Sequence, residues 1–206
     1  MIKIKPNEMS YIIPGDSKIV DAQSFVKFWK QFYDEQYAKE YDEVIASKSW
    51  TEEDLEKLFN WKNNMGKKEK KMSKSKKAFV KNASEHLEWL NESRGNVDLT
   101  NFLKLFKKAG PIWAITLLHA LDPSKYPIFD QHVYRAFLFL SDNTQEDLKR
   151  RIVYDRYQTN YMPFFQKTAG TIEGSGLALK DLDNSLWAFG RFLSQYPTML
   201  LRRGFL

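Results

Sequence analysis

Apolar residues recur at helical spacing along most of this chain, and this periodicity constrains the fold more than any other feature. In the segment 22–41, for example, Phe25, Phe28, Trp29 and Phe32 fall on one side of a helix. Beyond the first twenty residues, no segment alternates apolar and polar residues as a half-buried strand does. The pattern predicts an all-α protein of about nine or ten helices with short connections.

Capping and breaking residues set the expected helix boundaries. Ser, Thr and Asp precede several apolar runs as N-caps, and Gly or Pro follows them as stops. Residues 1–20 contain Pro6, Pro14 and Gly15, and they are predicted to form an extended arm or a small hairpin. Residues 168–176, rich in Gly and Thr, are predicted to form a loop. The predicted helices span 22–41, 51–63, 78–91, 96–109, 111–121, 133–140, 144–167 (interrupted by Pro163) and 179–196.

The chain has no cysteine among its 206 residues. Disulfides, thiolate zinc sites, iron–sulfur clusters and a cysteine nucleophile are therefore excluded, and a reducing, intracellular compartment is expected. The three histidines are scattered without metal-ligand spacing, so we expect neither a metal nor another cofactor. No stretch approaches the roughly 18 apolar residues of a membrane span, and the first residues lack a secretory apolar run. We expect a cytoplasmic protein, nucleoid-associated in a bacterium, with no membrane partner.

Positive charge is the next informative property. The formal net charge is +6, which favours a polyanionic partner such as nucleic acid or serves solubility alone. The charge is densest in residues 62–81, which hold nine Lys against one Glu. Such lysines neutralise phosphates without sequence selectivity, so Lys67, Lys68 and Lys74 are candidate DNA contacts. The alternative is a solvated loop and helix face.

The strongest candidate site lies where an extended segment enters a helix at Asp130. The preceding Tyr126–Phe129 contains Pro127, which restricts its neighbour to extended backbone. The plain role of an Asp at a helix start is to cap it by accepting backbone hydrogen bonds. His132 and Arg135 follow as polar residues on an otherwise apolar helix, which makes a functional role for Asp130 worth considering.

Three motifs here resemble those of the helix-hairpin-helix (HhH-GPD) DNA glycosylases of the endonuclease III type. Phe129-Asp-Gln-His-Val-Tyr-Arg-Ala136 is similar to their Asp, variable residue, His, apolar residue, any residue, Arg. Leu186-Trp-Ala-Phe-Gly-Arg191 looks like their helix with apolar-Gly-Arg, and Ser194 stands where the first cluster cysteine would be. Phe106-Lys-Lys-Ala-Gly110 takes the place of their Leu-Pro-Gly-apolar-Gly hairpin, with Lys108 instead of the first glycine. The resemblance covers about residues 105 to 197.

This resemblance implies a fold. The chain would form one HhH-GPD-like unit of two helical lobes with a cleft between them. One lobe would comprise residues 26–128, including the degenerate hairpin at 105–115, and the other residues 1–25 plus 129–206. Asp130 would lie at the lip of the cleft.

The resemblance also implies an activity: removal of a damaged or modified base from double-stranded DNA in base-excision repair, by a monomer. Asp130 would be the key carboxylate, stabilising the positive charge that builds on the sugar as the base leaves. The lysine nucleophile of bifunctional members corresponds to Ile112, which cannot form a Schiff base, so no lyase activity is expected. Lys107, Lys108 and Gly110 would face phosphates. The alternative is a catalytically inactive DNA-binding relative.

The remaining site residues are assigned supporting roles. His132 and Arg135 would anchor the Asp130 helix or reach phosphate, and Arg191 would join a buried ion pair or a hydrogen-bonded carbonyl network. His119 is expected to be a satisfied core histidine. An extruded base would stack on an aromatic residue. The candidates by position are Trp113, Phe129 and Tyr134, together with Tyr154, Tyr161 and Trp187, although core packing is expected of most of them.

Overall fold

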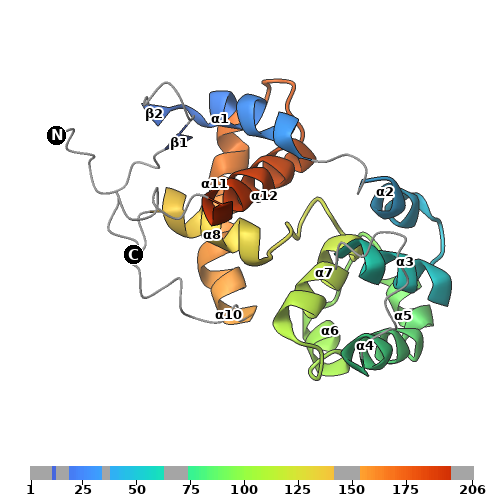
Figure 1. Cartoon of the computed structure of the whole chain (residues 1–206). Coiled ribbons are helices and arrows are strands. Elements are labelled where there is room, and N and C mark those ends of the chain that lie inside the picture. Colours follow the sequence, from blue (N-terminus) through green and yellow to red (C-terminus); the bar gives the residue numbers. More distant parts are fainter. Residues whose placement is uncertain (1–10, 13–18, 34–37, 63–73, 142–153, 196–206) are drawn as a thin grey trace. The chain divides into compact units, whose positions relative to one another are not determined.

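The computed structural model describes residues 11–12, 19–33, 38–62, 74–141 and 154–195. Helices make up nearly all the regular structure in these ranges, so the predicted all-α class is confirmed (Figure 1). The exception is a pair of two-residue strands, β1 (Tyr11–Ile12) and β2 (Ile19–Val20), which pair antiparallel with Tyr11 opposite Val20. These strands fall in the segment predicted to be an arm or a small hairpin.

The chain divides into two compact units. The terminal unit comprises Met1–Tyr33 and Pro127–Leu206, and the middle unit comprises Asp34–Tyr126. The expected lobes placed the first boundary at residue 25, which would cut through a helix. The structure instead keeps that helix whole within the terminal unit.

The middle unit is built from helices whose starts follow capping signals. The Thr51 hydroxyl accepts a hydrogen bond from the Asp54 amide at 3.3 Å, while the Asp54 carboxylate accepts one from the Thr51 amide at 2.9 Å. Asp98 accepts a hydrogen bond from the Asn101 amide at 3.1 Å and so caps the helix that begins at the next residue. The helices are α2 (Ala38–Ala46), α3 (Glu52–Lys62), α4 (Lys74–Ser84), α5 (Leu87–Glu92), α6 (Leu99–Leu105) and α7 (Pro111–Leu121).

Helix α7 is buried along most of its length, as its apolar composition predicts, and every residue from Ala114 to Leu121 is buried. His119 lies within this run. Its Nδ1 is 2.7 Å from the Tyr126 carbonyl oxygen, to which it donates, and its Nε2 accepts from the Tyr41 hydroxyl at 2.6 Å. His119 is therefore a hydrogen-bonded core histidine, as expected.

The terminal unit gathers segments from both ends of the chain. Pro163 lies in the first turn of α11, and the turn before it is π-helical. The wider turn accommodates a proline, which has no N–H to donate to the carbonyl four residues earlier. The elements are α1 (Ala22–Trp29), the 3-10 helix η1 (Lys30–Phe32), α8 (Gln131–Leu140), α10 (Tyr154–Arg156), the π-helix η3 (Tyr157–Tyr161), α11 (Met162–Ile172) and α12 (Leu179–Gln195).

Several predicted boundaries are wrong. The helix predicted over 78–91 is two helices, α4 and α5, separated by Glu85 and His86. The first part of the helix predicted over 144–167 lies outside the described residues. The helix predicted over 22–41 ends early, because Tyr33 adopts an extended conformation with ψ 129° after η1 and the chain then leaves the terminal unit.

The loop predicted over 168–176 is helical as far as Ile172. Thr168 is buried with Phe164 and Ile172, which lie at four-residue spacing on one face of the helix, and this burial favours the helix. The Thr168 hydroxyl is satisfied by donating to the Phe164 carbonyl at 3.0 Å.

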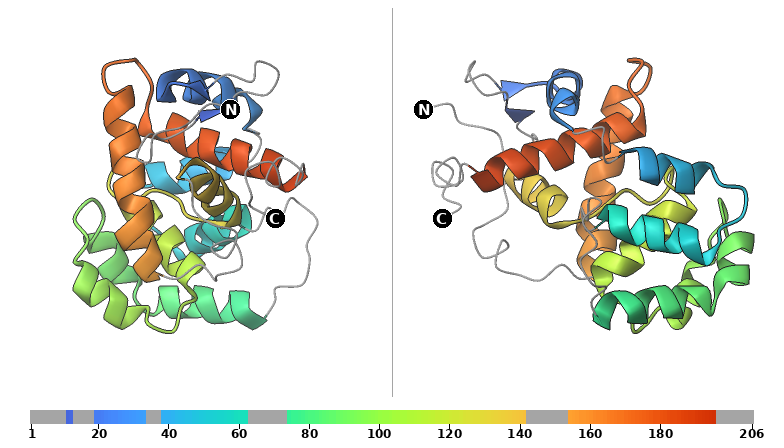
Figure 2. Two further views of the ribbon diagram at one scale, coloured as in Figure 1. Left: turned by 90° about the vertical axis from the view of Figure 1, so that its left-hand side faces the viewer. Right: turned by 45° about the vertical axis from the view of Figure 1, so that its right-hand side comes forward.

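Helix α12 organises the terminal unit by packing against both α8 and α1 (Figure 2). Phe189 sits where the three helices meet. Its ring is 5.4 Å from that of Phe25 on α1 and 5.3 Å from that of Phe139 on α8, both in edge-to-face geometry. Because this core fixes α8 against α12, it also fixes the start of α8, where Asp130 lies.

Candidate functional site

Asp130 is the N-cap of α8. Its backbone is extended, with φ −122° and ψ −174°, and its Oδ1 accepts hydrogen bonds from the amides of His132 at 2.8 Å and Val133 at 3.0 Å. The segment before it is buried, and the Tyr157 hydroxyl donates to the Pro127 carbonyl at 3.0 Å. The capping role considered from sequence is thus present. It also holds the carboxylate in one place at the positive end of a helix dipole.

Gly190 brings α12 into backbone contact with the first turn of α8. A Cβ at this position would lie 1.8 Å from the carbonyl oxygen of His132 and 2.5 Å from its carbonyl carbon, so only glycine fits. Arg135 spans the same crossing, because its Nη1 donates to the Gly190 carbonyl at 3.2 Å. The two motifs that resemble the glycosylases, about sixty residues apart in the chain, therefore meet beside Asp130.

His132 is a neutral, partly buried acceptor in this crossing. Its Nδ1 is 3.3 Å from Nη1 of Arg135, and since a guanidinium only donates, Nδ1 accepts and carries no proton. Burial lowers the pKa of His132, Asp130 opposes this by favouring the charged ring, and the positive charges of Arg135 and Arg191 lower it further. Burial likewise lowers the pKa of Arg135, and the nearby Asp130 raises it.

The role expected for Arg191 is wrong. Its side chain is exposed rather than buried, and its guanidinium carbon lies 5.3 Å from the centre of the Trp187 ring. The carbonyl bond expected of it is made instead by Arg135, from the neighbouring helix. The reason is helical geometry: Gly190 faces α8, and the next residue is rotated by about 100° around the helix axis, toward solvent.

The three aromatic residues first considered for a base pocket are Phe129, Tyr134 and Trp113. Phe129 is 1% exposed, and its ring stacks on that of Tyr161 at 4.4 Å. Tyr134 is 5% exposed, and its hydroxyl accepts a hydrogen bond from Arg156. Trp113 belongs to the middle unit, where it stacks on Phe59 with ring centres 4.2 Å apart. Core packing explains Phe129 and Tyr134, so a base-stacking role for these two is not supported, whereas Trp113 is partly exposed.

Two residues of the terminal unit, Tyr161 and Asp183, were missed or undervalued by the sequence reasoning. Tyr161 is fully buried, and its hydroxyl has no hydrogen-bond partner in the part of the chain that the structure describes. Burial raises the pKa of Tyr161 well above its usual value, and the charges of Asp183 and Asp130 raise it further. Asp183 is buried on α12, seven residues before Gly190, which places it two turns along the same helix face. That spacing was the available signal.

The hairpin between α6 and α7 places Lys107 and Lys108 at the surface, where both are exposed. Gly110 is the N-cap of α7, with φ −62° and ψ 150°, a conformation open to any residue. A Cβ there would only touch Trp113 at 3.9 Å, so neither backbone nor space requires glycine. Ile112 is partly buried in the first turn of α7.

The lysine-rich segment is only partly described. Lys67 and Lys68 lie outside the described residues. Lys74 begins α4, but its side chain also lies outside them. Their predicted contacts with DNA stay predictions.

We predict that Gly190→Ala disrupts the terminal unit. The added methyl group would collide with the backbone of α8, which cannot move aside as a flexible side chain would, so the loss should be roughly 3 kcal/mol of unfolding free energy or more. Gly170→Ala is the matched control, because a Cβ added to that helical glycine would have no other atom within 4 Å. It should be stabilising by about 0.5–1 kcal/mol. Urea unfolding measures the unfolding free energy of both variants. Equal stabilities of the Gly190→Ala and Gly170→Ala proteins would contradict the backbone contact between Gly190 and His132.

We predict that His132 makes stability fall in mild acid. Its folded-state pKa lies below its unfolded value of about 6.5, so the unfolded chain takes up the proton first as the pH drops. The contribution of neutral His132 is complete above that unfolded pKa and is lost as the pH falls through the folded one. The urea unfolding midpoint is measured as a function of pH. In the His132→Gln variant, the fall of this midpoint in mild acid should be smaller than in the wild type. An NMR titration midpoint of His132 at or above the unfolded value would refute it.

Comparisons of the chain with family models, with curated proteins and with solved structures found no match. Among the described residues, no group of three or more His, Cys, Asp or Glu side chains is arranged to hold a metal ion. No described helix is long and apolar enough to cross a membrane.

Proposed function

We propose that this protein is a monofunctional DNA glycosylase of the helix-hairpin-helix type, acting on a damaged or modified base in double-stranded DNA. The observation that carries the proposal is the contact of Gly190 with the first turn of α8. It joins the two best-matched motifs at Asp130, although neither motif needs the other to form its own helix. A chance resemblance of two separate helices gives no reason for them to meet at this residue.

The chemistry asked of Asp130 is electrostatic. As the N-glycosidic bond breaks, the electron pair leaves with the base and positive charge develops on the sugar. A fixed carboxylate stabilises that charge and orients or deprotonates the attacking water, whose oxygen then bonds to the sugar carbon. Oδ1 of Asp130 is fixed by two amide hydrogen bonds, as preorganisation requires. Ile112 supplies no amine, so the proposed reaction stops at base removal.

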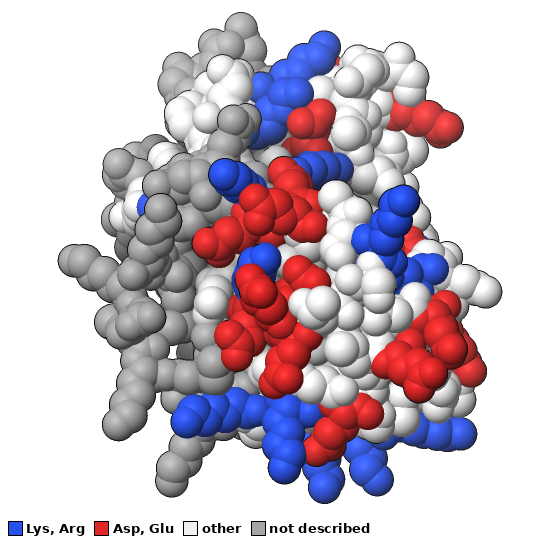
Figure 3. Space-filling view, turned by 90° about the vertical axis from the view of Figure 1, so that its right-hand side faces the viewer, with Lys and Arg blue, Asp and Glu red and all other residues white. Residues whose placement is uncertain are grey.

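The surface of the middle unit offers a phosphate-binding edge. Figure 3 shows blue side chains along the lower edge of one face, with red side chains between some of them and more at the centre of the face. Lys107 and Lys108 of the hairpin are exposed, as is Lys104 in the last turn of α6. Cations so placed attract a polyanionic backbone without reading its sequence.

A second candidate is a DNA-binding protein without catalysis. The observation that favours it is the burial of Phe129 and Tyr134, since these rings cannot hold an extruded base where they are. In that case Asp130 would serve only as the cap of α8. The two candidates share the binding surface and differ in the chemistry alone.

We predict that Asp130→Asn strongly slows base removal while preserving the fold. Asn caps a helix as well as Asp does, so only the charge is lost, and the rate should fall roughly 100- to 1000-fold. Duplexes carrying uracil, an alkylated purine, 8-oxoguanine or hypoxanthine are incubated with each protein, and abasic sites are then revealed with alkali. Asp130→Ala is the companion variant, expected to lose about 1 kcal/mol of stability with the cap.

Wild-type cleavage of one substrate that Asp130→Asn cannot cleave would support the enzyme. Binding without cleavage of any substrate would favour the silent protein. Equal cleavage by wild type and Asp130→Asn would rule out the proposed role of the carboxylate.

We predict that Lys107 and Lys108 contact phosphates. The double variant Lys107→Gln/Lys108→Gln should bind duplex DNA more weakly, and the slope of log K against log salt should become shallower by about 1.8, since each phosphate contact contributes about 0.9. Fluorescence anisotropy of a labelled duplex at several salt concentrations measures the slope. Lys39→Gln is the control variant, because Lys39 is an exposed lysine on α2 beside Glu40. It should leave the slope unchanged. An unaltered slope in the double variant would place the interface elsewhere.

A further inference from the structure

The π-helical turn η3 lies against the segment that leads into Asp130. Single π-helical turns are rare and occur frequently at functional sites. This one carries a tyrosine at each end, and both Tyr157 and Tyr161 are fully buried. The Tyr157 hydroxyl donates to the Pro127 carbonyl at 3.0 Å, and the Tyr161 ring stacks on that of Phe129 with centres 4.4 Å apart. Two residues of the turn therefore hold two residues of the segment before Asp130.

The backbone of this segment has little other support. Pro127 has no N–H to donate, and among the described residues no backbone–backbone hydrogen bond is made by residues 127–129. Pro127 is also buried, so its carbonyl would be costly to leave without a partner. The bond from the Tyr157 hydroxyl satisfies this carbonyl and fixes the path of the chain at that point.

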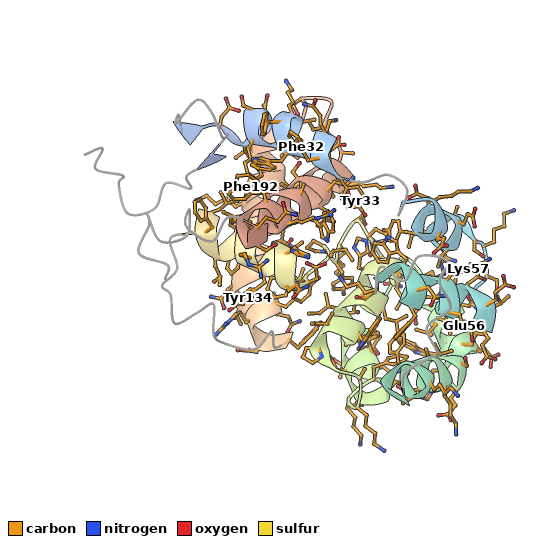
Figure 4. The ribbon with its side chains drawn as sticks, in the orientation of Figure 1. Phe32, Tyr33, Glu56, Lys57, Tyr134 and Phe192 are labelled. Atoms are coloured by element: carbon orange, nitrogen blue, oxygen red, sulfur yellow. The ribbon has the colours of Figure 1, made fainter. Side chains whose placement is uncertain are left out.

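The turn holds the segment with neutral groups. Burial raises the pKa of Tyr161 well above its ordinary value, and nearby carboxylates raise it further, so this hydroxyl stays protonated at neutral pH. The arginine just before the turn, Arg156, is engaged with Tyr134, which is labelled in Figure 4: it donates to the Tyr134 hydroxyl, and its guanidinium carbon lies 5.6 Å from the centre of that ring. The bond from Tyr157 therefore fixes the segment without itself bringing a positive charge toward the Asp130 carboxylate.

A carboxylate stabilises a developing charge well only from a fixed place. A misplacement of about 1 Å can cost roughly 100-fold in rate. The amide bonds from His132 and Val133 fix Oδ1 of Asp130 relative to the helix that follows. Asp130 itself has an extended backbone, so the direction of its side chain also depends on the segment that comes before it. That segment is the part which η3 holds.

We propose that Tyr157 is a positioning residue for Asp130. Its hydroxyl fixes the Pro127 carbonyl, and through the extended segment it sets the direction in which the carboxylate faces. This inference rests on the proposed function, because it gives the hydrogen bond a consequence for base removal. Tyr157 is buried and does not touch the substrate, so it acts only through Asp130.

Two variants that each remove one hydroxyl test the inference. Tyr157→Phe keeps the ring and its contact with Phe129, with centres 5.6 Å apart, so it is expected to fold. Tyr161→Phe is the matched control, because it changes an equally buried tyrosine of the same turn. The hydroxyl that it removes has no hydrogen-bond partner among the described residues. The two variants therefore differ in whether a hydrogen bond to the segment is lost.

Amide hydrogen exchange, measured by NMR on the full-length protein, reports on the cap without requiring activity. The amides of His132 and Val133 donate to Asp130, so in Tyr157→Phe they should exchange about 10-fold faster, as expected for the loss of one buried hydrogen bond nearby. Amides in the interior of α8, residues 137–140, are the reference, because a general loss of stability would speed their exchange as well. The control variant should leave the exchange of the cap amides unchanged.

The rate of base removal is measured under single-turnover conditions, on a substrate that the wild type cleaves. Tyr157→Phe should lower this rate roughly 10- to 100-fold and leave the Kd for the duplex unchanged, because the lost hydroxyl is buried. A purely structural role would lower the stability of the protein but leave the rate of the bound complex as in the wild type. The control variant should retain the wild-type rate.

The inference and the proposed enzyme fail in different ways. Faster exchange of the cap amides together with a lower single-turnover rate, both absent from Tyr161→Phe, supports the positioning role. Unchanged cap exchange or an unchanged rate in Tyr157→Phe overturns it, and so do equal effects in both variants. If the wild type cleaves no substrate, the proposed enzyme fails, and the exchange experiment alone decides whether Tyr157 positions Asp130.

Discussion

The backbone contact between Gly190 and His132 is the constraint on which the candidate site depends. With a Cβ at position 190, α12 would have to withdraw from α8, and the Arg135 bond to the Gly190 carbonyl at 3.2 Å would be lost. The same withdrawal would separate Phe189 from Phe139, whose rings now meet at 5.3 Å. One missing side chain therefore sets the distance between two helices. Through that distance it also sets the surroundings of the first turn of α8.

Sequence reasoning succeeded where local rules decide the outcome. Helix α7 could be predicted because Gly110 and Pro111 mark the start of a long apolar run. The cap at Asp130 could be predicted because this residue comes after an extended, proline-containing segment and before a helix. The Gly-Arg pair was recognised by resemblance, yet its physical reason appears only in three dimensions. No local rule tells which helix will approach Gly190, because the answer depends on the packing of residues far apart in the chain.

The errors share that origin. Apolar residues recur at one continuous helical spacing from 22 to 41. The chain nevertheless passes from the terminal unit to the middle unit after Tyr33, so this single pattern spans helices that belong to two different units. Thr168 and Gly170 are typical of loops, but the burial of Phe164 and Ile172 on one face keeps that segment helical. Arg191 illustrates the problem at a single residue. The resemblance implies a buried ion pair or a carbonyl network for Arg191, but only the phase of the helix shows that Arg135 is the residue that reaches the Gly190 carbonyl.

Asp130 combines two roles that are compatible for a physical reason. A cap needs an oxygen that accepts amide hydrogen bonds, and Oδ1 accepts both from His132 and Val133. A carboxylate has about four lone-pair sites on two oxygens, so serving as a cap does not by itself prevent it from acting on a sugar or a water. The amides at a helix start also favour the negative form that the proposed chemistry requires. A cap at this position therefore does not argue against catalysis, because the same bonds that stabilise α8 would hold the carboxylate ready.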